Sequence, residues 1–359
     1  MNAVRATVDL DDTRGLIAAD REALLPAASS AGAQVRATAA ALDEGALDSV
    51  RGEDRPRTLV WVAGRGTAQT AGLMLASALG GLAAEPIVVA AEAPPWVGAL
   101  DVVIVAGDDP GDPTLVDAAA TGVRRGARVV VAAPHEGPLR DTTAGRVAVL
   151  EPRIRVPDEF RLCRYLAAGL AVLQSVDAGL QTDLAVLADE LDSEALCNSA
   201  GREVFTNPAK ALAGRMSGNQ VALAGDCAAT LALARHGSSA LLRIGHQAAA
   251  ATGLADALVA LHETAAYGEP ADALFHDEQI DGPLPRRLRV LALTLAAERQ
   301  VVAARMAGLG DVDLVGADDV PDMAAGASVP VGVQRAEQQL AILAVRLEMA
   351  AVYVRLMRG

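Results

Sequence analysis

The chain has 359 residues, a formal net charge of −14 at pH 7 and a sequence pI of about 4.8, and 52% of its residues are hydrophobic. A chain of this length is too long to fold around one ordinary hydrophobic core, and its apolar content is high enough to fill two. We therefore expect a globular protein of two domains. The acidic balance argues against a nucleic-acid partner, because binding to a phosphate backbone requires clustered lysine and arginine side chains. Lysine occurs only once in the chain, at Lys210.

Cysteine spacing indicates a reducing compartment, and the hydropathy pattern indicates that no segment spans a membrane. Cys163, Cys197 and Cys227 lie far apart, in a spacing that fits neither a disulfide framework nor a metal-binding knuckle. No stretch is long enough and sufficiently free of charge to span a bilayer, and the N-terminus has no signal-peptide pattern. We therefore expect a cytoplasmic protein without a membrane partner.

The first part of the chain predicts helices and then an alternation of strands and helices. Residues 1–55 have amphipathic helical patterns and end in a polar break. Continuously apolar strands that alternate with helices are typical of a parallel sheet covered on both faces. The elements expected here are strands at Thr58–Ala63, Pro86–Ala90, Val102–Ala106 and Ala127–Ala133, and helices at Thr67–Leu79, Thr114–Arg125, Asp158–Val176 and Asp183–Leu191.

A second series of the same kind follows. Its expected elements are helices at Asn207–Met216, Ala228–His236, Glu298–Ala307 and Gln334–Met357, and strands at Gln220–Ala224, Arg289–Leu295 and Val312–Val315. The two series predict an N-terminal helical segment over residues 1–55 and a first α/β domain over residues 56–176. A helical linker over residues 177–200 and a second α/β domain with the C-terminal helix over residues 201–359 complete the prediction.

The stretch from Leu59 to Gly72 combines an apolar strand, a glycine turn and small residues that can open a helix. Such a turn offers free backbone N–H groups and the positive end of a helix dipole, so it suits an anion such as phosphate. One interpretation is a dinucleotide-binding turn with Glu85 as the ribose contact. Against it, Gln69 occupies the position where that fingerprint needs a third glycine for close helix–strand packing.

The order of motifs resembles the bifunctional phosphoglucose/phosphomannose isomerases, which have two SIS (sugar isomerase) domains, and in particular a degenerate, TobH-like branch of them. The matching segments are Gly64-Arg65-Gly66-Thr67, Phe160-Arg161, Asn207-Pro208-Ala209-Lys210, Gly225-Asp226-Cys227 and Phe275-His276-Asp277-Glu278. The resemblance covers most of the chain beyond residue 55. It implies an α/β fold of two SIS-type three-layer α/β/α domains with mostly parallel sheets, plus N-terminal and C-terminal helices.

The resemblance also implies roles for individual residues. His276 stands where the family has the histidine that opens the sugar ring, and Arg161 where it has an arginine at the start of the inter-domain helix. The turn at Gly64, Gly66 and Thr67 corresponds to the one that binds the substrate phosphate. The family further implies a homodimer that binds a sugar phosphate and needs no cofactor.

Two segments depart from the family pattern. Residues 108–113 read Asp-Asp-Pro-Gly-Asp-Pro where the family has hydroxyl and amide side chains that hold the phosphate. Carboxylates repel a phosphate dianion and proline has no N–H to donate. Asp108, Asp109 and Asp112 would offer oxygen ligands to a metal, but the prolines break the spacing of a calcium loop, so no metal site is expected. The family's catalytic glutamate is also replaced, and His246 stands in its segment as the candidate base.

Each candidate residue has an ordinary structural interpretation as well. His276, beside two acidic residues, fits a surface turn, and His246 fits a packing position on an alanine-rich helix. Arg161 has acidic neighbours, Asp158 and Glu159, with which a surface ion pair would contribute little to stability. The acidic residues between positions 108 and 112 fit a solvated turn.

Three hypotheses for the function follow from these observations. The first is a protein that binds a sugar phosphate or other carbohydrate derivative and has lost or changed its catalysis. The second is an active aldose–ketose isomerase acting on glucose 6-phosphate or mannose 6-phosphate through His276, Arg161 and His246. The third is a dinucleotide-dependent enzyme. The sequence favours the first, because the signatures of the fold persist while the phosphate-binding and base positions are altered.

Overall fold

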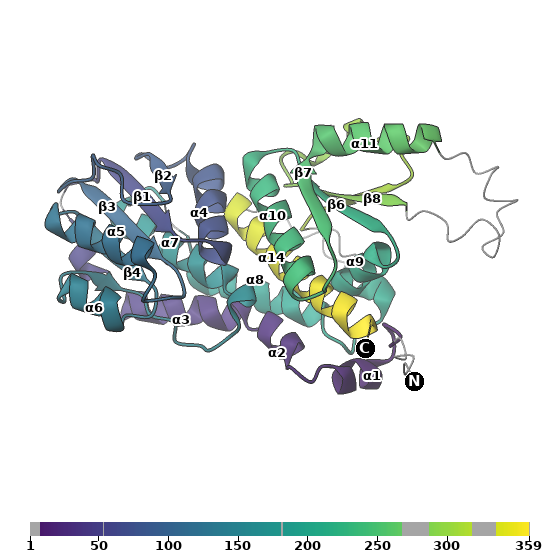
Figure 1. Cartoon of the computed structure of the whole chain (residues 1–359), viewed down its shortest axis with the longest axis horizontal. Coiled ribbons are helices and arrows are strands. Elements are labelled where there is room, and N and C mark those ends of the chain that lie inside the picture. Colours follow the sequence, from purple (N-terminus) through teal and green to yellow (C-terminus); the bar gives the residue numbers. More distant parts are fainter. Residues whose placement is uncertain (1–7, 53, 181, 268–286, 318–334, 359) are drawn as a thin grey trace, which may run out of the picture. The chain divides into compact units, whose positions relative to one another are not determined.

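The computed structural model describes residues 8–52, 54–180, 182–267, 287–317 and 335–358 (Figure 1). The chain forms two compact units. The first-sheet unit comprises Ala23–Leu196 and Arg335–Val345, and the second-sheet unit comprises Met1–Glu22, Cys197–Gln334 and Arg346–Gly359. The long C-terminal helix α14 (Ala336–Met357) contributes residues to both units.

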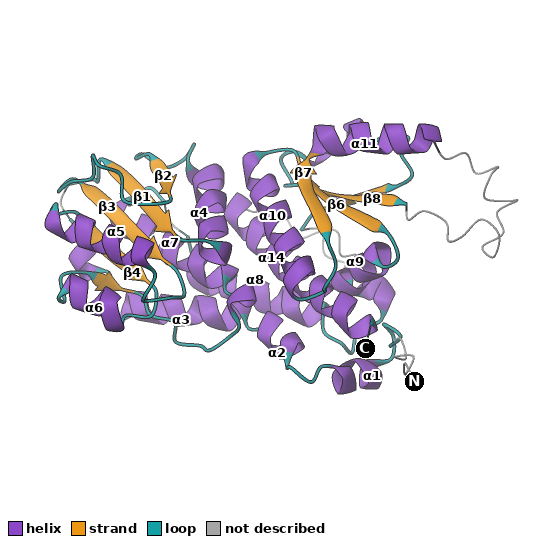
Figure 2. Ribbon diagram, in the orientation of Figure 1, coloured by secondary structure: helices purple, strands orange, loops and turns teal. Residues whose placement is uncertain are grey.

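The first-sheet unit is built around a five-stranded parallel sheet in the order β2-β1-β3-β4-β5 (Figure 2). Its strands are β1 (Thr58–Ala63), β2 (Ile87–Ala90), β3 (Asp101–Ala106), β4 (Arg128–Ala132) and β5 (Ala148–Val149). Its helices are α2 (Leu24–Ala28), α3 (Ala31–Asp43), α4 (Gly66–Leu79), α5 (Pro113–Arg124), α6 (Gly137–Thr143), α7 (Leu162–Val176) and α8 (Leu184–Cys197). Every residue of β1 and β3 is buried, as expected for central parallel strands covered on both faces.

The two faces of this sheet are covered by different helices. Valines of β1, β3 and β4 pack with apolar residues of α5 and α6 on one face. On the other face Trp61 of β1, which is only 1% exposed, donates a hydrogen bond from Nε1 to the carbonyl oxygen of Ala68 in α4 at 3.0 Å. A Cβ on Gly72 of α4 would lie 2.4 Å from Trp61 Cδ1, and one on Gly169 of α7 would lie 2.2 Å from Leu75 Cδ1. The small residues therefore allow α4 and α7 to approach closely and complete a three-layer unit.

The second-sheet unit repeats this plan with a four-stranded parallel sheet in the order β7-β6-β8-β9. Its strands are β6 (Gln220–Gly225), β7 (Ala249–Gly253), β8 (Leu288–Leu293) and β9 (Val312–Val315). Its helices, besides α14, are α1 (Thr13–Ala19), α9 (Pro208–Met216), α10 (Ala228–Arg243), α11 (Leu254–Tyr267) and α13 (Arg299–Arg305). Apolar residues of α11 and α13 pack on one face of the sheet. On the other face Gly237 of α10 lies against Leu223 of β6 and Leu347 of α14.

The predicted α/β fold with parallel sheets is confirmed, and the strands that were predicted begin and end within two residues of the observed ones. Two of the described strands were not predicted. β5 (Ala148–Val149) has only two residues, and β7 reads Ala-Ala-Ala-Thr-Gly, an alanine run that favours a helix in isolation. The pairing of β7 with β6, from Val221↔Ala249 to Gly225↔Gly253, overrides that preference. Among the helices of the described ranges, none has both the length and the apolar character needed to cross a membrane.

Candidate functional site

The candidate site lies at the carboxyl ends of β1 and β3 in the first-sheet unit. The chain passes from β1 to β2 on one side and then returns to place β3 on the other side of β1, so the strand order reverses between these neighbours. In open parallel sheets, ligands bind in the crevice at such a reversal. The turn after β1 and the loop after β3 meet here, since a Cβ on Gly64 would lie 2.6 Å from Asp112 Oδ2.

The turn after β1 presents the N-terminus of α4. Gly66 has φ +69°, in the left-handed region that favours glycine, and Arg65 precedes α4 in an extended conformation. Both residues are exposed, and the Arg65 side chain has no hydrogen bond or ion pair with the residues that the structure describes. The positive end of the α4 dipole and a free guanidinium group thus lie side by side in the chain, which is a favourable arrangement for an anion.

The hydroxyl of Thr67 is already engaged. Thr67 is buried, and its Oγ1 donates a hydrogen bond to the carbonyl oxygen of Asp158 at 3.2 Å. Asp158 begins a short 3-10 turn, η2 (Asp158–Phe160), which leads directly into Arg161 and α7. Thr67 therefore links the glycine turn to the segment that carries Arg161.

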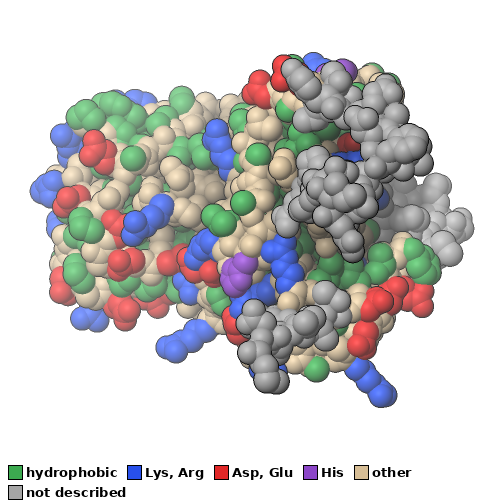
Figure 3. Space-filling view, turned by 45° about the vertical axis from the view of Figure 1, so that its right-hand side comes forward, with side chains coloured by type: hydrophobic (Ala, Val, Ile, Leu, Met, Phe, Trp, Pro, Cys, Tyr) green, Lys and Arg blue, Asp and Glu red, His purple; other side chains and the backbone are tan. Residues whose placement is uncertain are grey.

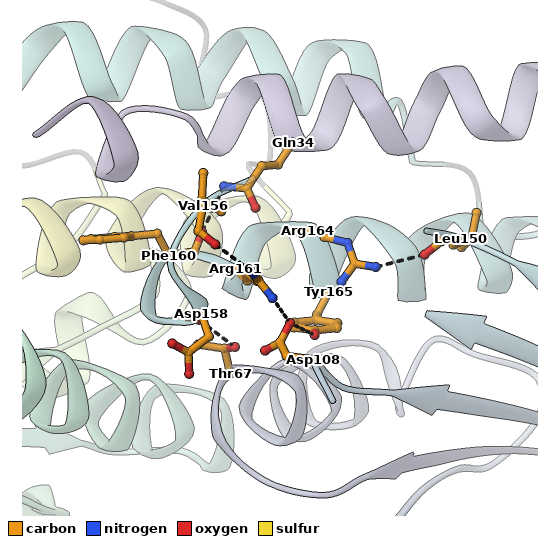
Figure 4. A network of polar contacts seen from close by, with 10 residues as sticks. All are labelled: Gln34, Thr67, Asp108, Leu150, Val156, Asp158, Phe160, Arg161, Arg164 and Tyr165. Atoms are coloured by element: carbon orange, nitrogen blue, oxygen red, sulfur yellow. Dashed lines mark hydrogen bonds and ion pairs between the residues drawn. The ribbon is translucent and has the colours of Figure 1, made fainter. Parts of the chain in front are cut away.

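Asp108, which follows β3, Arg161 and Tyr165 form a compact network (Figure 4). Arg161 Nη1 forms an ion pair with Asp108 Oδ1, and the Tyr165 hydroxyl donates to the same oxygen at 2.6 Å. Arg161 also donates from Nε and Nη2 to the carbonyl oxygen of Val156, at 2.9 and 2.7 Å. Burial raises the pKa of Tyr165, so the phenol is a neutral donor at physiological pH. Asp108 is left with one oxygen, Oδ2, that accepts no hydrogen bond from a described residue.

Neighbouring side chains hold this network in place. Arg164 donates from Nη2 to the carbonyl oxygen of Leu150 at 2.9 Å, and its guanidinium carbon lies 4.9 Å from the centre of the Tyr165 ring. Burial lowers the pKa of Arg164, and the charge of Asp108 acts in the opposite direction. Gln34 of α3 donates to the carbonyl oxygen of Phe160 at 2.9 Å, so α3 fixes the turn before Arg161.

The structure corrects two interpretations of this region. Arg161 pairs with Asp108 rather than with its neighbours Asp158 and Glu159, although Asp108 is 53 positions away in the chain. The acidic loop is not simply a solvated turn. Asp108 is only 29% exposed, and Asp112 caps α5 by accepting a hydrogen bond from the backbone N–H of Thr114.

His246 belongs to the second-sheet unit and lies in the loop between α10 and β7. The interpretation that places it on a helix is wrong, since its φ is +49° and its side chain is exposed. Its Nε2 is 3.3 Å from Arg355 Nη1, and its carbonyl oxygen accepts from Arg358 Nη1 at 3.1 Å. Because guanidinium groups only donate, Nε2 must be an acceptor here. Figure 3 shows a histidine among basic side chains on one face of the molecule.

The position of His246 separates it from the glycine turn of its own unit. It precedes β7, so it lies at the amino edge of the second sheet, whereas Gly225 ends β6 at the carboxyl edge. Beyond Gly225, Asp226 forms an ion pair with Arg305, and Cys227 caps α10 through a hydrogen bond from its N–H to Thr230 Oγ1 at 3.2 Å. His276, the predicted ring-opening histidine, lies outside the described residues.

The predicted ribose contact is also wrong. Glu85 precedes β2 and so lies at the amino edge of the first sheet, opposite to the glycine turn. A dinucleotide fold requires its acidic residue at the carboxyl edge, beside the turn. Glu85 is 2% exposed, and neither of its side-chain oxygens has a hydrogen-bond partner. Burial, with a smaller contribution from the negative charge of Asp177, raises its pKa.

We expect Glu85→Gln to stabilise the protein relative to wild type increasingly as the pH rises. The raised pKa of the folded state means that the protonated glutamate contributes stability below its unfolded-state pKa and that this stability is lost as the pH rises through the folded-state value. The variant should gain about 1–2 kcal/mol over wild type between pH 4.5 and pH 8, measured by urea unfolding at both values. Glu92→Gln, at an exposed position, is the control. A difference between Glu85→Gln and wild type that is the same at both pH values would contradict the assignment.

Comparison with known proteins shows the fold. No family model matches the sequence, and no curated protein matches it. A candidate phosphosugar isomerase from Clostridium difficile 630 has a similar structure, with a TM-score of 0.61, 10% identity and coverage of 94% of this chain and 93% of that one.

Two further solved structures are similar over nearly their whole length. Tagatose-6-phosphate ketose/aldose isomerase from Escherichia coli has a TM-score of 0.56 and 14% identity, with 94% of each chain covered. The C-terminal domain of glucosamine-fructose-6-phosphate aminotransferase from Francisella tularensis has a TM-score of 0.56 and 10% identity, with 96% of each chain covered. The chain thus has an α/β fold of SIS-type three-layer α/β/α domains.

Proposed function

We propose that this chain is a SIS-type protein that binds a sugar phosphate, or a related carbohydrate derivative, at the β1/β3 edge of the first-sheet unit without isomerising it. The observation that carries the proposal is the turn Gly64–Thr67, which opens α4 with a free arginine at the reversal of strand order. Backbone N–H groups of α4 and the Arg65 guanidinium would hold the phosphate. The similar solved structures support the ligand class, since two of them are named for sugar phosphates, tagatose 6-phosphate and fructose 6-phosphate.

Loss of catalysis is inferred from two residues, Arg161, whose donors are occupied, and His246, which lies away from the glycine turn of its own unit. An arginine that stabilises an enediolate must direct its donors at the substrate, but Nε and both terminal nitrogens of Arg161 are occupied by Val156 and Asp108. His246 lies at the amino edge of its sheet and faces Arg355, which is unsuitable for a base that takes a proton on Nε2. An active isomerase using His276, Arg161 and His246 is the alternative, and it would require Arg161 to leave Asp108.

The finer assignments belong to the same proposal. By its resemblance to the phosphoglucose/phosphomannose isomerases, we assign the chain to their degenerate TobH-like branch, with glucose 6-phosphate or mannose 6-phosphate as the nearest ligands. We likewise propose a cytoplasmic homodimer. A dinucleotide ligand is not proposed, because Glu85 lies at the wrong edge of the sheet.

Calorimetric titration with glucose 6-phosphate, mannose 6-phosphate, fructose 6-phosphate and inorganic phosphate tests the proposal. We expect binding by the wild type and a loss of about tenfold or more in affinity for Arg65→Ala, because a charge-assisted hydrogen bond to phosphate is removed. Arg124→Ala is the matched control, since this exposed arginine ends α5 at the amino edge of the same sheet. The same samples should not convert fructose 6-phosphate. Absence of heat with all four ligands would overturn the binding site, and turnover would overturn the loss of catalysis.

A further inference from the structure

Asp108 holds a carboxylate in a fixed orientation at the edge of the candidate site. Its Oδ1 accepts from both Arg161 and Tyr165, two residues one helical turn apart at the start of α7. Tyr165 is fully buried, so the donor that orients the carboxylate cannot rotate freely. Oδ2 has no partner among the described residues and is not a buried oxygen, so it is open to solvent. The carboxylate therefore keeps one accessible acceptor in the loop after β3, at the carboxyl edge of the first sheet.

The chemistry of that acceptor limits what it can bind. A carboxylate oxygen accepts hydrogen bonds and does not donate, so its partners are hydroxyl, amine or ammonium groups. A phosphate dianion offers it no proton and repels it. Sugar hydroxyls, in contrast, donate well to a carboxylate whose orientation is already fixed.

The neighbouring arginine explains how a carboxylate is compatible with an anionic ligand nearby. The ion pair with Arg161 makes the two side chains together electrically neutral, so Asp108 does not exclude a phosphate held by Arg65 and α4. The loop that carries Asp108 after β3 meets the glycine turn after β1, since a Cβ on Gly64 would lie 2.6 Å from Asp112 Oδ2, and Figure 4 draws Asp108 and Thr67 in the same region. A ligand with a phosphate at one end and hydroxyl groups at the other would contact both.

We infer that Asp108 is a specificity-determining residue that accepts hydrogen bonds from the hydroxyl groups of the ligand, so that this site selects a polyhydroxylated phosphate ester over phosphate itself. Tyr165 and Arg161 are positioning residues for that carboxylate. The inference rests on the proposed phosphate site at Arg65 and α4 and adds the part of the ligand that this site recognises.

Asp108→Asn is the decisive variant, because the amide keeps the shape of the carboxylate. Its oxygen can still accept from Arg161 and Tyr165, which leaves an NH₂ group that donates at the position where Oδ2 accepts. We expect the ratio of the affinities for glucose 6-phosphate and inorganic phosphate, measured by calorimetry on the full chain, to fall by about tenfold or more. Affinity for inorganic phosphate should not fall, because loss of the carboxylate charge leaves Arg161 uncompensated, so the change in the ratio must include a loss of affinity for glucose 6-phosphate. Tyr165→Phe should reduce the same ratio by a smaller factor, since Arg161 still holds Oδ1.

Asp109→Asn is the matched control. Asp109 is the exposed neighbour whose Oδ1 accepts from the backbone N–H of Gly111, a bond that asparagine can also accept, so the ratio should stay at the wild-type value. Thermal unfolding of each variant establishes that it is folded, and Tyr165→Phe provides the test if Asp108→Asn is not.

The outcomes separate this inference from the proposed function. An unchanged ratio in folded Asp108→Asn would overturn the inference and leave the phosphate site intact. A gain in affinity for both ligands would also overturn it, because Asp108 would then act as an internal competitor for Arg161. If glucose binds in an Asp108-dependent manner but inorganic phosphate does not bind, the phosphate site is overturned and the role of Asp108 is supported. If none of the three compounds binds to the wild type, both fail.

Discussion

Gly225→Ala is expected to destabilise the second-sheet unit by more than about 4 kcal/mol, beyond the range of most single substitutions. A Cβ at this position would lie 2.3 Å from the backbone nitrogen of Leu231 and 2.5 Å from the carbonyl carbon of Thr230. Both atoms belong to the first turn of α10, so no side-chain rotation can relieve the overlap. Gly225 is also paired on both sides, with Gly253 of β7 and Leu293 of β8, so the strand cannot move away.

Urea unfolding followed by circular dichroism measures this effect, and hydrogen exchange in α10 shows whether the loss is local to its first turn. Gly66→Ala is the matched control in the other glycine turn. Its φ of +69° strains an alanine, but no atom lies within 4 Å of the added Cβ, so we expect a cost of about 1 kcal/mol. Near-equal stabilities of the two variants would refute the steric argument. The comparison distinguishes a glycine required for helix–strand packing from one required for backbone conformation.

The parts of the fold that could be predicted depend on local pattern. The strands Thr58–Ala63 and Val312–Val315 are observed at their predicted positions, because continuously apolar runs between turn signals allow few other structures. The alanine-rich strand β7 could not be recognised, since its conformation comes from pairing with β6. Local propensity carries little information where tertiary contacts decide the structure.

The candidate site divides in the same way. Gly64, Gly66 and Thr67 could be identified because a turn that opens a helix has a compact sequence signature. The partner of Arg161 could not, because Asp108 lies on a different element and the two meet only through the order of the strands. The sequence did contain one local signal. An aspartate just after a buried strand lies at the carboxyl edge of a parallel sheet, and the glycine turn after β1 lies at the same edge. No pattern in the sequence marked Tyr165 as part of the site. Its role as a donor to Asp108 follows from its buried position on α7.

Lys210→Met is expected to destabilise the second-sheet unit by about 1–3 kcal/mol. Lys210 is fully buried, and its Nζ donates to the carbonyl oxygens of Ala200 and Arg202 at 2.8 and 2.6 Å. The ammonium group also lies 5.6 Å from the centre of the Tyr353 ring. Methionine replaces the aliphatic stem but removes both donors, which leaves the Arg202 carbonyl oxygen without this partner at a cost of about 1–3 kcal/mol, whereas the Ala200 carbonyl oxygen still accepts from Thr13 Oγ1.

The remaining residues of the segment Asn207-Pro208-Ala209-Lys210 have similar structural roles. Asn207 caps α9 by accepting from the backbone N–H of Lys210 at 2.9 Å, and its amide donates to the carbonyl oxygen of Ser199 at 3.0 Å. The Tyr353 hydroxyl donates to the carbonyl oxygen of Asn198 at 2.6 Å, and burial raises the pKa of Tyr353 to about 12, so this donor stays protonated. The segment therefore joins the loop over residues 198–202 to α9 and α14.

These contacts argue that the segment Asn207-Pro208-Ala209-Lys210 stabilises the second-sheet unit. Urea unfolding of Lys210→Met against Arg202→Met, which removes an exposed cation from the same loop, isolates the contribution of the two hydrogen bonds that Lys210 Nζ donates. Below its unfolding transition, Lys210→Met should bind glucose 6-phosphate as the wild type does, because the proposed site belongs to the first-sheet unit. A variant of wild-type stability that no longer binds the ligand would instead place Lys210 in the binding machinery. We expect retained binding and lowered stability, because Lys210 Nζ donates to backbone carbonyl oxygens of its own unit.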